Sequence, residues 1–271
     1  MLKVDRQFER RGPLYVPRYG ADLARPGRRV ERYKDRYRPR RFRAALSVIQ
    51  SISTDNTSGG SCSLSLSGVG SGNSILAVGC STGAGGTDFS FSGATFSRLV
   101  TQSQGNFQLQ QWLTGPLSGA SYSITGSESG ASTMSLALLE IAGLGATQPD
   151  VTNNSGAVIN NLPVNSGSVT NTVANEIFIT AVGAYIPAGT GNFIAPSGYT
   201  MQENVHDGYL AVAYKIVSSI GSTNPQWTAA TGPQYIYADI VGLSASSTPP
   251  FEDDGFQPVA SPGDARFVTV Y

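Results

Sequence analysis

The sequence predicts an all-β protein, a jelly-roll-like two-sheet sandwich built from an internal duplication, with a long extended basic N-terminal arm and an extended C-terminal tail. Three observations lead to this prediction. From residue 62, short runs of alternating apolar and small polar residues follow one another, separated by Gly, Asn, Ser or Pro. Five of these runs recur in the same order 99 to 105 residues later. Residues 1–43 hold 15 Lys+Arg and 5 Asp+Glu, whereas the rest hold 3 and 13.

The first element, residues 1–48, is predicted to be an extended arm. Pro13, Pro17, Pro26 and Pro39 exclude a continuous helix, because proline removes a backbone donor and restricts the residue before it. One short helix is expected at about 28–37, ending before Pro39. Such a segment cannot bury enough apolar surface by itself, so we expect it to order only against another surface.

Arginine dominates the arm, with 13 Arg to 2 Lys, and aromatic residues stand between the arginines. Arginine is the better residue for bidentate and stacked contacts. We therefore expect the arm to dock on a protein neighbour; contact with nucleic acid and a freely solvated tail are the alternatives. The predicted partner-binding residues are Arg10, Arg11, Tyr15, Arg18, Tyr19, Arg25, Arg28, Arg29, Arg32, Tyr33, Arg36, Tyr37, Arg38, Arg40, Arg41, Phe42 and Arg43.

The body is predicted to hold two copies of one β unit. The first repeat spans 49–146, a linker spans 147–168, and the second repeat spans 169–245. The matching runs are "NSILAVG" with "NEIFITAVG", "FSGATF" with "APSGYT", "FQLQQWL" with "YLAVAYK", "SYSIT" with "QWTAA", and "LLEIAGLG" with "YADIVGLS". This alignment places Trp112 opposite Tyr214 and Glu140 opposite Asp239.

One copy alone would leave sheet edges exposed and one apolar face uncovered. Two copies packed face to face solve both problems, so one composite sandwich is favoured over two separate sandwiches in tandem. "LALLEI" and "YIYADIV" are typical of central strands, and "SGAT" and "SGYT" of tight turns before strands. The tail, 246–271, is rich in Pro and acidic residues and ends in "RFVTVY", a strand expected to join its own sheet or a neighbour's edge.

The sequence offers little for catalysis or metal binding, so we predict a protein that is not an enzyme and has no cofactor. The one histidine, His206, stands with Glu203 and Asp207, a pattern more typical of a surface loop than of a metal site. Glu140 and Asp239 lie within apolar runs of different repeats, where we expect edge or sheet-face residues and not a glycosidase pair. The sequence contains no apolar run of 18 residues, so no membrane span is predicted.

The remaining candidates are expected to be core residues. Cys62 and Cys80 are predicted to be buried free thiols, with one bridge between them as the minority interpretation. The aromatic residues of the body could form a sugar-binding platform, but at these spacings sandwich core is favoured. They are Trp112, Tyr214, Trp227, Tyr235 and Tyr237.

Residues 62–245 resemble a β-sandwich module of phage and phage-like structural proteins and of some bacterial surface proteins. The resemblance is carried by "NSILAVGCS", "FSGATFSRLV", "LQQWLTGPLSGASYSITGS" and "LALLEIAGLGATQPD", followed by the second copy. It implies no catalytic residues, and it does not extend to the basic arm.

A basic Pro-rich arm joined to a Ser/Gly/Thr-rich sandwich looks like a virion component. We therefore expect a bacteriophage capsid decoration (cement) protein or minor capsid protein, made in the host cytoplasm and located at the capsid surface. The expected partners are the major capsid protein or other virion subunits, with homo-oligomers expected and nucleic acid reachable through the arm. The alternatives are a carbohydrate- or receptor-binding tail or fibre protein, with a site near Trp112 or in 185–208, and a virion protein that contacts nucleic acid.

Overall fold

In the computed structural model, the described residues form strands joined by turns. The structure describes residues 45–83, 88–104, 106–154, 162–185, 193–205, 209–229 and 234–246. The predicted arm up to residue 44 and the tail from residue 247, including "RFVTVY", lie outside the described residues. The described residues include no helix long and apolar enough to cross a membrane.

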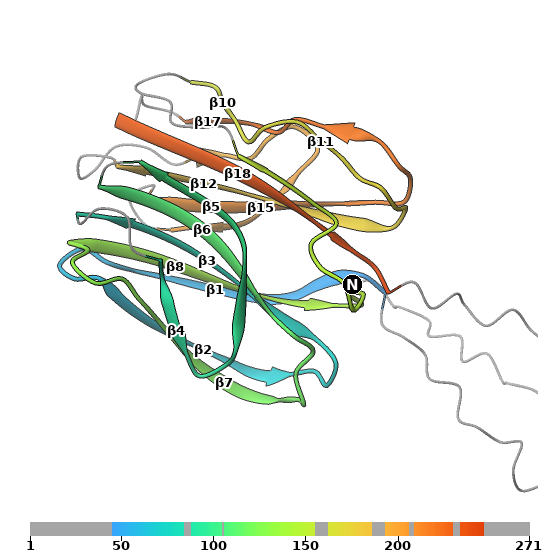
Figure 1. Ribbon diagram of the computed structural model, residues 1–271, viewed down its shortest axis with the longest axis horizontal. Coiled ribbons are helices and arrows are strands. Elements are labelled where there is room, and N and C mark those ends of the chain that lie inside the picture. Colours follow the sequence, from blue (N-terminus) through green and yellow to red (C-terminus); the bar gives the residue numbers. More distant parts are fainter. Residues whose placement is uncertain are drawn as a thin grey trace, which may run out of the picture. The chain divides into compact units, whose positions relative to one another are not determined.

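Two five-stranded antiparallel sheets form the centre of the body (Figure 1). The first inner sheet has the order β1 (Ser47–Asn56), β8 (Thr133–Ala142), β3 (Ser74–Thr82), β6 (Phe107–Thr114) and β5 (Phe96–Gln104). The second inner sheet has the order β14 (Thr200–Asn204), β15 (Leu210–Val217), β12 (Glu176–Tyr185), β18 (Gln234–Ser244) and β9 (Val151–Asn154).

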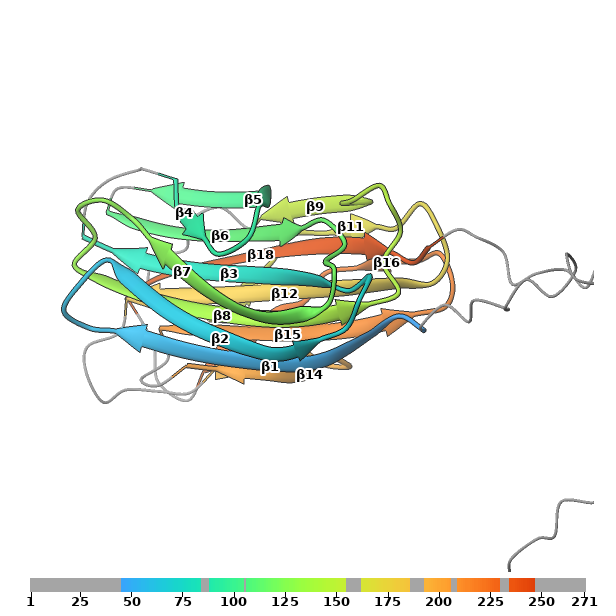
Figure 2. The ribbon, with the colours of Figure 1, turned by 90° about the horizontal axis from the view of Figure 1, so that it is seen from below.

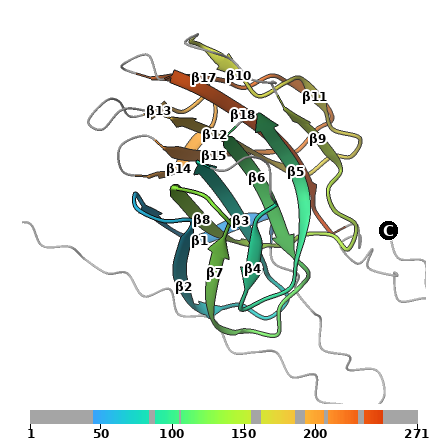
Figure 3. The same cartoon turned by 60° about the vertical axis from the view of Figure 1, so that its left-hand side comes forward.

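Smaller sheets cover the outer face of each inner sheet (Figure 3). The first outer sheet contains β2 (Ser61–Val69), β7 (Ala120–Ser127) and β4 (Ser90–Ser92). The second outer layer contains β10 (Val164–Asn165), β17 (Gln226–Ala229) and β13 (Phe193–Ile194), with the pair β11 (Val169–Thr170) and β16 (Ser222–Thr223). The body is therefore a stack of four β layers.

The largest core lies between the inner sheets. Leu76 and Leu139 of the first sheet pack in one cluster with Ile179 and Val241 of the second. The rings of Phe107 and Tyr237 stack across this interface with centroids 4.4 Å apart. Separate clusters fill the space beneath each outer layer.

Burial follows from the sequence pattern of each strand. In β2, "SCSLSLSGV", exposed serines alternate with buried Cys and Leu, because successive side chains of a strand point to opposite faces. In β3, "SILAVGCST", every residue is buried, because this strand packs against a layer on each side. A chain with such strands needs a cover on both faces of the sheet.

The four layers correct the expected arrangement in one respect. One five-stranded sheet from each half does face the other, as the composite sandwich requires. Each half also folds an outer layer over the far side of its own sheet, because β3, β8 and β12 are apolar on both faces. The predicted linker, 147–168, contributes β9 and β10 to these layers.

The inner sheets share one order of strands. Read across the sheets, the orders are β1-β8-β3-β6-β5 and β9-β18-β12-β15-β14. When the strands of each sheet are numbered by their order in the sequence, both sheets have the order first, fifth, second, fourth, third. The expected turns "SGAT" and "SGYT" precede β5 and β14, and each places its glycine at positive φ, 94° at Gly93 and 77° at Gly198. "LALLEI" and "YIYADIV" form interior strands, as predicted.

The residue pairs that the sequence alignment equates do not share a face. Trp112 packs in the cluster under the first outer sheet, whereas Tyr214 packs against the core between the inner sheets. Side chains alternate along a strand, so an alignment that is shifted by one residue exchanges the two faces.

Side-chain bonds join the edges of the inner sheets. At one edge, Ser53 Oγ of β1 donates to Glu203 Oε2 of β14 at 2.6 Å. At the other, Asn154 Nδ2 of β9 donates to the Thr101 carbonyl oxygen of β5 at 3.3 Å. Figure 2 shows β1 beside β14 and, on the opposite side, β5 beside β9.

Candidate functional site

The predicted partner-binding residues, Arg10 to Arg43, all lie outside the described residues, and their role stays a prediction. His206 and Asp207 also lie outside them. Glu203 is described, and its carboxylate accepts hydrogen bonds from Ser51 and Ser53 of the facing inner sheet. Within the described ranges, no group of three or more His, Cys, Asp or Glu side chains gathers in a way that could hold a metal ion.

Glu140 lies on the outward face of the first inner sheet and is fully buried. Its carboxylate accepts hydrogen bonds from the Gly70 backbone N–H at 2.8 Å, from Asn73 at 2.5 Å and from Gln50 at 2.6 Å. Burial would raise the pKa of Glu140, but these three donors outweigh it and lower the pKa. Glu140 is therefore a charged anchor for the loop that precedes β3.

Asp239 lies on the inward face of the second inner sheet, where it is fully buried opposite Gln111. Gln111 Nε2 donates to Asp239 Oδ1 at 2.6 Å, and Gln111 Oε1 and Asp239 Oδ2 have no hydrogen-bond partner among the described residues. Burial raises the pKa of Asp239 to about 7, against the hydrogen bonds from Gln111 and the Ala181 backbone.

Glu140 and Asp239 therefore do not form a catalytic pair. The first inner sheet separates the two carboxyl groups, since Glu140 faces its outer side and Asp239 faces the core between the sheets. Glu140 and Asp239 do lie on sheet faces, as one of the two expectations had it, but neither lies on an edge strand. Both residues lie on interior strands, which accounts for their complete burial.

An acid pair that the sequence analysis missed lies where β12 begins. Glu176 is fully buried, and its pKa is raised to about 8 by burial, then by a polar contact with Asp150 and by the negative charge of Asp150. This contact is looser than a normal hydrogen bond, because neither Glu176 oxygen has a partner of standard geometry in the described chain. Asp150 accepts bonds from the Thr172 backbone N–H at 2.8 Å and from the Thr172 hydroxyl. An acid at the start of the apolar run "NEIFIT" was the available signal.

The prediction of buried free thiols is confirmed for both cysteines. Cys62 Sγ donates to the Met134 carbonyl oxygen at 3.1 Å, and burial, followed by the charge of Asp55, raises the pKa of Cys62 to about 11. Burial, then the charges of Glu128 and Asp239, raise the pKa of Cys80 further. A thiol held in its neutral form is a poor nucleophile and a poor metal ligand.

The described aromatic candidates are mostly core, as favoured, and the Tyr235 side chain lies outside the described part of the chain. Trp227 and Tyr237 are buried, and Trp227 Nε1 donates to Thr180 Oγ1 at 3.0 Å. Trp112 is half-buried, with the Arg98 guanidinium 5.8 Å from its ring centroid. These rings do not form an open stacking platform.

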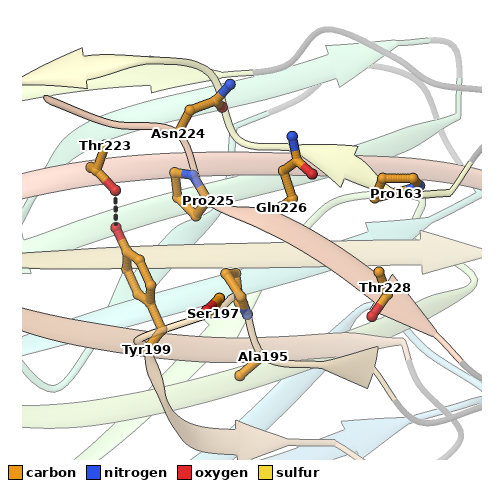
Figure 4. A pocket seen from close by; sticks show the side chains of 10 residues that line it. Pro163, Ala195, Ser197, Tyr199, Thr223, Asn224, Pro225, Gln226 and Thr228 are labelled. Atoms are coloured by element: carbon orange, nitrogen blue, oxygen red, sulfur yellow. Dashed lines mark hydrogen bonds between the residues drawn. The ribbon is translucent and has the colours of Figure 1, made fainter.

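One surface depression, of about 420 Å³, opens on the second outer layer (Figure 4). Its first wall comes from the segment that joins β13 to β14. This wall contains Ala195, Pro196, Ser197 and Tyr199. The Tyr199 hydroxyl lies 3.1 Å from Thr223 Oγ1. Burial raises the pKa of Tyr199, and the bond to Thr223 only partly offsets this rise.

The second wall of the depression comes from β16, β17 and the turn between them, with Pro163 at one side. This wall contains Thr223, Asn224, Pro225, Gln226 and Thr228. The segment 195–199 falls within the stretch 185–208 named for a binding site, whereas the "STNPQWT" segment was missed. Its Pro and Asn residues indicate a turn, but nothing in the sequence places that turn beside Tyr199.

We compared the chain with known protein families, curated proteins and solved structures. No protein-family model, no curated protein and no solved structure matches the chain.

Proposed function

We propose that the protein is a non-enzymatic structural component of a virus particle, a capsid decoration (cement) protein or a minor capsid protein. In this proposal the N-terminal arm docks on neighbouring subunits and the β body projects outward. The observation that carries the proposal is the separation of charge, a net of +10 in residues 1–43 and −10 in the remainder. Charge asymmetry of this size points to a partner with a negative surface.

The described body presents few free carboxylates to such an arm. It contains eight acidic residues, of which Glu128, Glu140, Glu176 and Asp239 are buried. Of the others, Asp88 pairs with Arg98, and Glu203 bonds to serines. Within the described part of the body, this distribution leaves few acidic groups for the arm to contact.

The place where the arm joins the body also suits a tether. Ser47, the first residue of β1, pairs with Ala142. The next residues, Gly143 and Leu144, contact the end of the described chain, since the Ser246 N–H donates to the Gly143 carbonyl oxygen at 2.9 Å and Leu144 pairs with Ala245. The first and last described residues of the body therefore lie beside each other.

The proposal also covers the origin of the two halves of the body. We infer that the body is a jelly-roll-like sandwich built by internal duplication of one β unit, and the shared order of strands in the inner sheets supports the duplication. The proposed location is the capsid surface, with the major capsid protein or other virion subunits as partners and with self-association into homo-oligomers.

The test compares the full chain with a variant that lacks residues 1–43. We expect the variant to keep its β circular dichroism and cooperative melting, and to lose co-sedimentation with particles that carry the wild-type protein. Retention of the shortened chain on particles would contradict the proposal.

A second pair of variants separates the effect of the arm's positive charge from that of the bidentate bonding geometry of arginine. Replacement of Arg25, Arg28, Arg29 and Arg32 by Lys keeps the charge and removes bidentate bonding, whereas replacement by Gln removes both. Weakened incorporation by the Lys variant supports docking on protein carboxylates. Binding of the full chain to DNA with a steep salt dependence, and none to genome-free particles, would support the nucleic-acid alternative.

A further inference from the structure

The depression on the second outer layer has an uncharged lining that is rich in hydrogen-bonding groups. None of the ten described residues that line it carries a formal charge. The nearby cation Lys215 stands over the Tyr199 ring, with Nζ 5.9 Å from the centroid. A site for a phosphate or a carboxylate would need a cation or a cluster of backbone N–H groups directed at the ligand.

Four of the lining side chains are exposed and polar, and none of them has a side-chain hydrogen bond within the part of the chain that the structure describes. They are Ser197, Asn224, Gln226 and Thr228. Hydroxyl and amide groups both donate and accept, so they match a ligand that does the same. The Tyr199 ring and the proline rings supply the apolar surface between these polar groups (Figure 4).

The frame beneath these side chains is rigid. Trp227, on the strand that carries Gln226 and Thr228, is fully buried and donates to Thr180 of the inner sheet. The Ser166 N–H donates to the Pro225 carbonyl oxygen at 3.0 Å, and its hydroxyl pairs with Thr180 Oγ1 at 2.6 Å. On the other wall, the Tyr199 N–H donates to the Pro196 carbonyl oxygen at 3.0 Å. The backbone of a site held in this way needs little ordering when a ligand binds, and the entropy cost falls on the exposed side chains.

We infer that this depression is a binding site for a neutral oligosaccharide. Its volume of about 420 Å³ falls within the range of small-molecule sites, about 300–1,000 Å³. A proline-rich peptide would need a groove lined by several aromatic rings, and the described lining residues contain one aromatic ring, that of Tyr199. A hydroxyl-rich, uncharged ligand satisfies the free polar groups and needs no cation.

The experiment titrates the full chain with neutral hexasaccharides of glucose (α-linked and β-linked) and of N-acetylglucosamine, with hexagalacturonate as the charged probe. We expect saturable binding of at least one neutral probe, and a loss of affinity of about tenfold or more in a Gln226→Ala/Thr228→Ala variant, because two hydrogen bonds are removed. Both residues are exposed, so the fold should be unaffected.

The matched control is Ser121→Ala/Ser123→Ala, two exposed residues on the outer sheet of the other half, which should bind like wild type. Tyr199→Phe tests the hydroxyl that pairs with Thr223 while keeping the ring. Three outcomes would overturn the inference: no neutral probe binds near 1 mM, only the charged probe binds, or the Gln226/Thr228 variant binds undiminished.

Discussion

At the scale of single residues, partners decide the state of each buried acid. Glu140 has three donors and a lowered pKa, whereas Asp239 has the Gln111 amide and one backbone contact and a raised pKa. Asp239 Oδ2 and Gln111 Oε1 both lack partners among the described residues. Protonation of Asp239 provides the missing donor, since a carboxylic acid can donate to the amide oxygen of Gln111.

We predict that the free energy of unfolding falls as the pH rises from about 4 to 7. The folded state holds the Asp239 proton up to a pKa of about 7, against 3.8 for an aspartate in the unfolded chain, so this contribution is complete well below pH 3.8 and is lost as the pH rises through 7. The loss amounts to at most roughly 4 kcal/mol. Asp239→Asn should flatten this part of the curve, because its amide N–H₂ can donate to Gln111 Oε1 at every pH.

Urea unfolding at several pH values measures this effect. Glu176→Gln in the same background should remove the slope that remains up to about pH 8, since the pKa of Glu176 is raised from 4.5 to about 8. An unchanged pH profile in Asp239→Asn would show that Asp239 is ionised in the folded protein.

At the scale of strands, the spacing between the inner sheets depends on small residues. A Cβ atom added at Gly183 of β12 would lie 2.8 Å from Cys80 Sγ and 3.0 Å from Phe107 Cζ, both on the facing sheet. Close contact of this kind forces neighbouring side chains or the sheets themselves to shift. Gly183 therefore sets how closely β12 approaches β3 and β6.

We predict that Gly183→Ala destabilises the protein by about 1–3 kcal/mol, the usual cost of overpacking. The gain from a less flexible unfolded chain, about 0.4–1 kcal/mol, does not offset this. In a Cys80→Ala background the penalty should shrink by about 1 kcal/mol, because the nearest atom is gone. Chemical denaturation of the wild type, the two single variants and the double variant measures this coupling. Gly115→Ala is the separate control, since no atom lies within 4 Å of its added Cβ.

The strands that could be predicted from the sequence are those with a clear pattern. Alternation in "SCSLSLSG" and apolar runs such as "SILAVGCS" correspond to β2 and β3. The short strands β9, β10, β13 and β16 were missed, because two to four residues carry no period and their pairing is set by the layer beneath them. The longer strand β1 (Ser47–Asn56) was missed as well, since the expected strands began at residue 62 and its first two residues fall in the predicted arm 1–48. The second wall of the depression was missed for the same reason as the short strands, since β16 and the turn before β17 reach Tyr199 through tertiary packing.

At the scale of the whole body, the largest core belongs to neither half alone. Leu76, Val78 and Leu109 of the first half pack against Ile179 and Val212 of the second. Each half covers the far face of its inner sheet with its own outer layer, but the near face of that sheet is covered only by the other half. Neither half could expose this face to water without a large loss of hydrophobic stabilisation.

We predict that the two halves unfold together and stay associated after the chain is cut. A protease site inserted between Asn154 and Leu162 keeps β9 on the first fragment, where it still pairs with β18 of the second. After cleavage, both fragments should co-elute on size exclusion and separate only in denaturant, and calorimetry of the uncut chain should show one transition. Separation in plain buffer, or two melting transitions, would mean that each half is stable with its inner face exposed, as two sandwiches in tandem would be.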